Sequence, residues 1–177
     1  AEVSGRRLVL AGPIGNTDYF REFIAPKLSE RVSYAGHLDQ QRLASLVGGA
    51  AAALVTPLWD EPYCLVAAEA AACGTPVVAF ERGGIPEVLD ANSGRLVAPG
   101  DVFAMAAAIP AAVRLPRESV RDSAIARCSA RSMVRRYVAI YRDLIDERNS
   151  ADNDWLLRAS PRSGASGQGD QHLRTSA

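Results

Sequence analysis

The sequence predicts an α/β fold built on a doubly wound, parallel β-sheet. Short apolar segments alternate with segments of helical spacing, and Gly or Pro separates most of them. Hydrophobic residues also make up 48% of the 177 residues, which suits a packed core. In chain order, we expect strands over residues 7–11, 31–35, 51–56, 77–80 and 94–97.

The predicted helices begin and end at residues with known capping roles. Asp39 and Asp101 each precede an apolar pattern of helical spacing, and Gly48-Gly49 ends the first of these helices. Pro116 separates two later helices, and Ser129 caps the last one. Further helices are expected over residues 18–28, 63–72 and 86–89.

The composition divides the chain into two regions. Beyond residue 148 it changes to Ser, Gly, Arg and Asp, and residues 155–157 form the one hydrophobic cluster there. We therefore expect a folded domain over residues 1–148 and a flexible tail over residues 149–177.

The charge and cysteine content exclude several classes of protein. Lys and Arg number 20 and Asp and Glu number 20, and this balance argues against a nucleic-acid-binding protein. No run approaches the roughly 20 apolar residues of a membrane span, and no signal peptide is visible, although peripheral membrane contact stays open. Three cysteines without metal-ligand spacing favour a reduced, cytoplasmic setting and no metal site.

The most informative segment is the loop that follows the third predicted strand. In open α/β sheets, ligands bind beyond the carboxyl ends of the strands, where loops enter helices. Here an acidic loop ends at Glu61 and a helix begins near Tyr63 or Cys64. Free N–H groups at such a helix start favour an anion, and they belong to Cys64, Leu65 and Val66.

A second acid, Glu69, lies in the second turn of this helix, where a carboxylate can accept hydrogen bonds from ribose hydroxyls. Glu61 would face another part of the same ligand. Alternatively, Asp60 and Glu61 are solvated loop acids and Glu69 is a surface residue of the helix. The small apolar residues that flank Glu69 favour a site over a solvated face.

These residues carry a resemblance to a known family. The stretch EPYCLVAAEAAACGTPVVAF over residues 61–80, followed by GGIPEV over 83–88, resembles the signature of glycosyltransferase family 4. The match includes two glutamates separated by seven residues, the small helix, the CGTPVV strand entry and the GG-x-PE loop. With the flanking strands, the resemblance covers roughly residues 6–145.

The resemblance implies the C-terminal, Rossmann-like half of a GT-B fold and a retaining transferase of carbohydrate biosynthesis. Such an enzyme moves a sugar from a nucleotide diphosphate sugar to an acceptor, without a metal or another cofactor. In the family, an Arg and a Lys that neutralise the diphosphate come from a strand–helix unit upstream of the segment that resembles residues 7–11. We expect this chain to lack that unit and the N-terminal acceptor domain, and therefore to be inactive alone.

The same upstream strand would be the central one in a sheet of order 3-2-1-4-5-6. The strands over 7–11 and 51–56 would then lack the neighbour that lies between them. Three alternatives follow: another chain supplies that strand, the two strands close up on each other, or the fragment is marginally stable.

Family roles transfer to this sequence position by position. Glu61 matches the acid near the donor sugar and the reacting face, which makes it the catalytic candidate, and Glu69 matches the acid that holds the ribose. The remaining donor-binding candidates are backbone segments: Tyr63, Cys64, Leu65 and Val66 for the diphosphate and sugar, Gly12 and Pro13 after the first strand, and Gly36, His37 and Leu38 around the nucleobase. The position of Cys64 is usually glycine in relatives, so this sequence departs from the pattern there.

Other interpretations stay open. His37 could act as a base, and Cys64 or Cys73 as a nucleophile, although packing roles suit both cysteines. The chain could also be a non-catalytic nucleotide-sugar-binding or interaction module that another chain completes. A dinucleotide-binding domain is disfavoured because no GxGxxG motif follows a strand.

Overall fold

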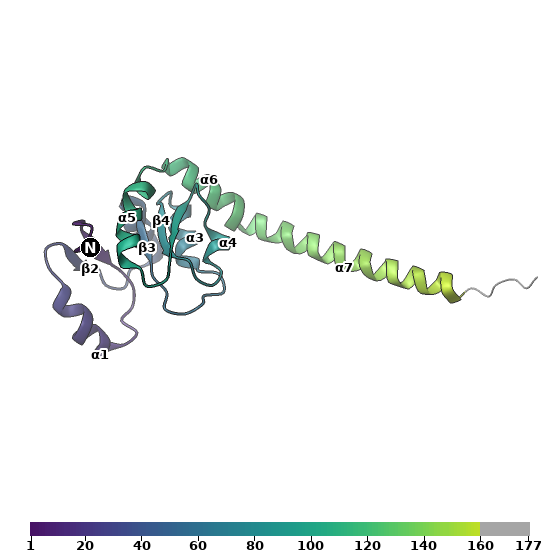
Figure 1. The fold of residues 1–177 in the computed structure, drawn as a ribbon, viewed down its shortest axis with the longest axis horizontal. Coiled ribbons are helices and arrows are strands. Elements are labelled where there is room, and N and C mark those ends of the chain that lie inside the picture. The colour runs from purple at the N-terminus through teal and green to yellow at the C-terminus, as the bar shows by residue number, and fades with distance from the viewer. Residues whose placement is uncertain (160–177) are drawn as a thin grey trace, which may run out of the picture. The chain divides into compact units, whose positions relative to one another are not determined.

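The computed structural model describes residues 1–159, with side chains through residue 148. These residues belong to two units, which divide between Val134 and Arg135. The strands of the described residues are β1 (Leu8–Leu10), β2 (Val32–Tyr34), β3 (Ala53–Val55), β4 (Val77–Phe80) and β5 (Gly94–Val97). The helices are α1 (Thr17–Tyr19), η1 (Phe20–Ile24), η2 (Ala25–Lys27), α2 (Gln40–Gly49), α3 (Leu65–Ala72), α4 (Ile85–Val88), α5 (Val102–Val113), α6 (Arg117–Cys128) and α7 (Ala130–Ala159) (Figure 1).

The strands form two parallel sheets, which confirms the predicted α/β class. β1 pairs with β2, and β3, β4 and β5 form a second sheet in that order. The sequence predicts that the first and third strands lack a common neighbour. Within the described residues, β1 pairs only with β2 and β3 only with β4, so these two strands have not closed up on each other.

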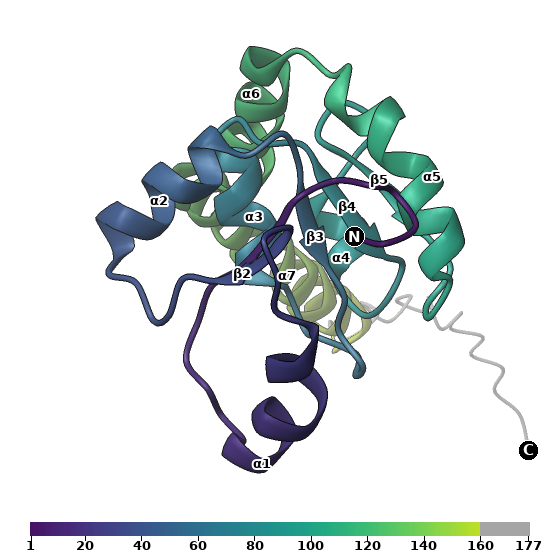
Figure 2. The ribbon, with the colours of Figure 1, turned by 90° about the vertical axis from the view of Figure 1, so that its left-hand side faces the viewer.

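Helices cover both faces of the three-stranded sheet. Every residue of β4 is buried, and alternate side chains point to opposite faces. Val77 and Ala79 pack with residues of α3, α4 and α6, whereas Val78 and Phe80 pack with Met105 and its neighbours on α5. Figure 2 shows α3 and α5 on opposite sides of these strands.

Three predicted caps are present as hydrogen bonds. The Asp39 carboxylate accepts from the amide of Arg42 at 2.8 Å, and the Asp101 carboxylate accepts from the amide of Ala104 at 2.8 Å. The Ser129 hydroxyl accepts from the amide of Ser132 at 3.2 Å. These bonds satisfy N–H groups that the helices leave unpaired, so the starts of α2, α5 and α7 are fixed locally.

The segment between β1 and β2 is helical, as predicted, but irregular. It passes from α-helical through π-helical to 3₁₀ geometry between Thr17 and Lys27. Pro26 lies in the last part, and its missing N–H removes one bond of the α-helical pattern.

The helix α7 extends through Ala159, so residues 149–159 of the predicted tail are helical. A polar composition predicts a flexible chain, but residues 149–159 contain neither Gly nor Pro. Without such a residue, a helix already formed continues through Leu156 and Leu157, which are good helix formers. The rest of the predicted tail, residues 160–177, lies outside the described residues.

Candidate functional site

The loop from Thr56 to Cys64 leads from β3 into α3 and contains the predicted site. The helix begins at Leu65, and Cys64 is its N-cap residue with a φ of 71°, in the left-handed region. An L-residue in this conformation costs about 1–2 kcal/mol. The left-handed turn places the first helical amides, those of Leu65 and Val66, at the end of the loop, where no intrahelical acceptor exists for them.

The side chain of Cys64 lies in the core. It is 4% exposed and packs in the cluster that contains Val55 and Ala67. Burial raises the pKa of the Cys64 thiol, the hydrogen bond with the Ala67 backbone lowers it, and the Glu61 carboxylate raises it further, so that the net shift is upward. The departure from glycine at this position therefore adds a core side chain, and a buried thiol with a raised pKa is poorly suited to act as a nucleophile.

The two glutamates differ in their surroundings. Glu61 is half-buried, and its carbonyl accepts a hydrogen bond from the amide of Gly84 at 2.7 Å. Glu69 is exposed although Ala68 and Ala70 beside it are buried. The small flanking residues thus face the core, while the Glu69 carboxylate faces solvent and is accessible to a ligand.

Large apolar side chains surround the helix start. Leu65 and Val66 are 65% and 63% exposed, and Tyr63, Trp59 and Leu58 are exposed as well. An acidic group, unpaired helical amides and exposed apolar side chains therefore share one loop. This combination suits a ligand with an anionic part and hydroxyl groups.

The second group of predicted residues lies at the carboxyl ends of β1 and β2. The amide of Gly12 donates to the carbonyl of Gly36 at 3.0 Å, and the hydroxyl of Tyr34 donates to the carbonyl of Gly12 at 2.6 Å. Gly12 has a φ of 140° and Gly36 a φ of 79°, so both turns need glycine. These bonds join the two loops that the sequence assigns to the nucleotide.

The side chains around these turns are largely accessible. Pro13 and His37 are exposed, and Leu38 is half-buried. Gly12 and Pro13 line a small pocket together with Phe20 and Tyr34. The loops at Gly12 and Gly36 belong to the β1–β2 sheet and the loop at Glu61 to the β3–β5 sheet, and the assignment of all these residues to donor binding remains a prediction.

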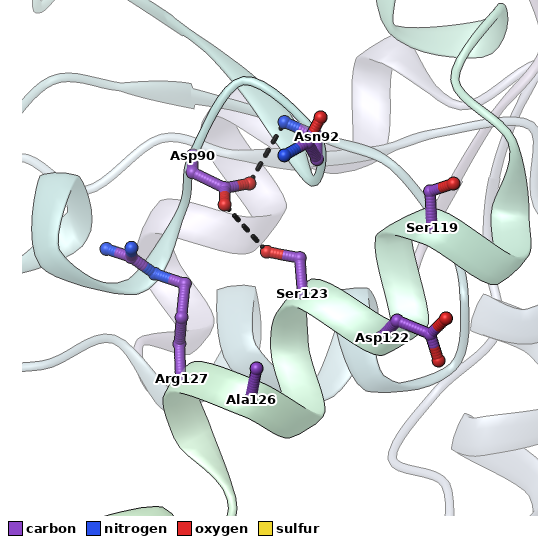
Figure 3. A pocket seen from close by; sticks show the side chains of 7 residues that line it. All are labelled: Asp90, Asn92, Ser119, Asp122, Ser123, Ala126 and Arg127. Carbon is purple, nitrogen blue, oxygen red and sulfur yellow. Dashed lines mark hydrogen bonds between the residues drawn. The ribbon is translucent and has the colours of Figure 1, made fainter.

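A polar pocket that the sequence analysis missed lies between α6 and the turn before β5. Figure 3 shows the carboxylate of Asp90 between Asn92 and Ser123. One Asp90 oxygen accepts from the amide and hydroxyl of Ser93 and from the amide of Asn92, and the other accepts from the hydroxyl of Ser123 at 2.9 Å. Asp122 and Arg127 also line the pocket.

The pKa of Asp90 reflects these contacts. Burial raises the pKa, but the hydrogen bonds from Ser93, Ser123 and the amides of Asn92 and Ser93 outweigh it and hold the pKa below its usual value. The Asp90-Ala-Asn-Ser93 sequence is typical of a turn that an aspartate closes on its own backbone, and it could have indicated the turn. Ser123 lies 33 positions away in the sequence, so no local pattern indicates the contact that joins the turn to α6.

Two kinds of feature are absent from the residues that the structure describes. None of the described helices is long and apolar enough to cross a membrane. No three His, Cys, Asp or Glu side chains within that part of the chain are grouped so that they could hold a metal ion.

Known proteins resemble this chain in sequence and in fold. The glycogen synthase of Mycobacterium tuberculosis is 42% identical over 95 residues, which make up 53% of this chain and 23% of that relative. AviGT4, a glycosyltransferase involved in avilamycin A biosynthesis, matches with a TM-score of 0.68 and 34% identity over 82% of this chain and 46% of its own. Anabaena Alr3699/HepE, solved with UDP-glucose, has a TM-score of 0.61 and 24% identity over 81% of this chain and 41% of its own.

The chain thus spans less than half the length of each of these relatives. Its parallel sheets and flanking helices are those of a Rossmann-like half of a GT-B glycosyltransferase, as the sequence predicts. The family model described as glycosyl transferases group 1 matches residues 1–114, which include both groups of predicted site residues. The match extends over more than half of the chain, and the chain therefore belongs to the group 1 family of glycosyl transferases.

Proposed function

We propose that this chain is the donor-binding part of a retaining glycosyltransferase, which moves a sugar from a nucleotide diphosphate sugar to an acceptor. The observation that carries the proposal is the loop between β3 and α3. It presents the half-buried Glu61 and the exposed Glu69 on either side of the first amides of an eight-residue helix. Family membership and the UDP-glucose complex of Alr3699/HepE support the same class of donor.

Each part of the loop suits one part of such a donor. The amides of Leu65 and Val66 suit the diphosphate because the positive end of the helix dipole lies there. The Glu69 carboxylate suits the ribose hydroxyls, since a carboxylate accepts hydrogen bonds from both hydroxyls of a diol. Glu61 then faces the sugar and the reacting carbon. The leaving phosphate itself would lie close to the incoming acceptor hydroxyl, so neither a metal nor a protein base is needed.

We propose further that the isolated chain does not turn over. The departing diphosphate carries the charge that the enzyme must stabilise, and preorganised cations supply much of that stabilisation in phosphate sites. The segment over residues 56–66 contains no Lys or Arg, so the loop itself offers helical amides but no cation for this charge. Sugar transfer by the 177-residue chain at the rate of a complete relative would contradict this proposal.

The donor class is tested by titrating the chain with UDP-glucose, GDP-mannose and ADP-glucose in a calorimeter. We expect one of the three to bind and E69Q to weaken it at least about tenfold, because a hydrogen bond to a charged group is lost. Glu118→Gln is the matched control, since Glu118 is an exposed glutamate in the first turn of α6. The proposal is wrong if no nucleotide sugar binds, or if the two variants bind it equally well.

A further inference from the structure

The loop that presents Glu61 is held by the segment that follows β4. Leu58 is 84% exposed and Trp59 is 60% exposed, so these apolar side chains do not anchor the loop in the core. The contacts that hold it come instead from residues 82–84. We infer that Arg82 is a positioning residue that fixes the loop and thereby places Glu61 against the sugar; this inference rests on the proposed function.

The guanidinium of Arg82 spans the loop at two points. Its Nη1 donates to the carbonyl oxygen of Leu58, and its Nε lies 3.6 Å from a carboxylate oxygen of Asp60. The Arg82 side chain is 31% exposed, whereas that of Asp60 is 82% exposed. The bond to the Leu58 carbonyl joins a charged donor directly to the loop backbone, whereas an exposed ion pair by itself contributes little. Arg82 therefore acts mainly by holding the loop backbone.

The two glycines after Arg82 bring the backbones into direct contact. A Cβ at Gly83 would lie 2.3 Å from the Glu61 carbonyl oxygen, and one at Gly84 would lie 2.2 Å from the Pro62 carbonyl oxygen. The amide of Gly84 also donates to the carbonyl of Glu61 at 2.7 Å. Glu61 is thus fixed on its carbonyl side by Gly84, and the preceding residues are fixed by Arg82.

The residues that would bind different parts of the donor are held in place by different parts of the structure. Glu69 and the amides of Leu65 and Val66 lie on α3, which packs on the core through its alanines, and they do not depend on Arg82. Glu61 lies on the loop and does depend on it. Loss of the Arg82 side chain should therefore weaken recognition of the sugar while binding of the nucleotide diphosphate is retained.

The first test uses the free protein and needs no ligand. In R82M, which keeps much of the side-chain volume and removes the donors, the Gly84 amide should exchange with solvent at least about tenfold faster, because a hydrogen bond from a charged group no longer holds the loop closed. R95M is the matched control, since Arg95 also donates to backbone carbonyls, those of Ala91 and Gly94, and is half-buried. Equal Gly84 exchange in R82M and R95M, measured by NMR, would overturn the inference.

The second test compares ligands. It uses whichever of UDP-glucose, GDP-mannose or ADP-glucose binds the wild-type chain, together with the corresponding free nucleotide diphosphate. R82M should lower the ratio of the affinity for the nucleotide sugar to the affinity for the free diphosphate by at least about threefold. Affinity for the free diphosphate should change less than twofold, and R95M should leave both affinities unchanged. An equal loss for both ligands would assign Arg82 a general structural role and overturn the inference. If no nucleotide binds the wild-type chain, the proposed function fails, and Gly84 exchange still decides the role of Arg82.

Discussion

At the scale of single residues, Cys64 combines a strained backbone with a buried side chain. It is the one described residue other than glycine with a positive φ. The conformational cost of about 1–2 kcal/mol is offset in part by burial of the thiol, which is 4% exposed. The same turn lets the loop end at Cys64 and α3 begin at Leu65 with its first amides unpaired. The strained turn at Cys64 thus occurs together with the unpaired helical amides that would bind an anion.

The contact between Cys64 and Glu61 has a measurable electrostatic consequence. The Glu61 carboxylate raises the pKa of the Cys64 thiol because it accepts a hydrogen bond from the protonated thiol and disfavours a second negative charge. E61Q should therefore lower the pKa of Cys64, which the Cβ chemical shift of Cys64 would follow through a pH titration. Glu118→Gln, remote from the loop, should leave the titration unchanged. A thiol pKa that stays constant or rises in E61Q would show that the two side chains do not interact.

At the scale of elements, Asp90 joins the turn before β5 to α6. Its carboxylate accepts from Ser93 in the turn and from Ser123 on the helix. The lowered pKa of Asp90 means that the folded state favours the ionised form. The stabilisation is therefore fully present above the ordinary aspartate pKa near 3.9. It is lost as the pH falls through the lower pKa of the folded state.

Substitution of Asp90 tests this connection. D90N should destabilise the protein by about 1–2 kcal/mol at neutral pH, because charge-assisted hydrogen bonds are replaced by weaker ones. Since the variant has no carboxylate there, the stability difference from wild type should shrink below about pH 4. Urea unfolding at several pH values measures both effects. Asp122→Asn, on the same pocket but exposed, is the control, and equal losses in the two variants would contradict the role of Asp90.

At the scale of the whole molecule, burial is unevenly distributed within Ala1–Val134. The buried side chains begin at Val55, and none occurs in β1, β2 or the helices that precede β3. Val9 in β1 is 45% exposed, whereas Val77 in β4 is fully buried. Apolar burial supplies most of the free energy that opposes unfolding. The two-stranded sheet should therefore open more readily than the three-stranded sheet.

Hydrogen exchange of matched backbone amides tests this difference. The amide of Leu8 donates to Arg31, that of Ala35 donates to Leu10, and that of Val77 donates to Ser93, so all three are hydrogen-bonded. We expect Leu8 and Ala35 to exchange by local opening at least about 100-fold faster than Val77, after correction for intrinsic rates. Equal protection of the three amides would show that both sheets unfold together.

The agreement between the predicted and observed elements has a local physical cause. Asp39 and Asp101 cap the helices that follow them through bonds within three residues, and β4 is recognisable from four consecutive apolar residues. Composition, which reports average solvation, predicts a flexible tail, whereas the absence of Gly and Pro from residues 149–159 lets α7 continue.

The amino-acid sequence by itself thus determined which segments form strands and helices, the α/β class and the family. It also determined which loop and following helix contain Glu61 and Glu69. Each of these depends on periodicity, capping or a motif within a short stretch of chain. The tertiary structure decided which way the Cys64 side chain points, that Arg82 holds the Glu61 loop, and that Asp90 bonds to Ser123. Contacts between segments 22 to 33 positions apart depend on packing, which no local sequence pattern records.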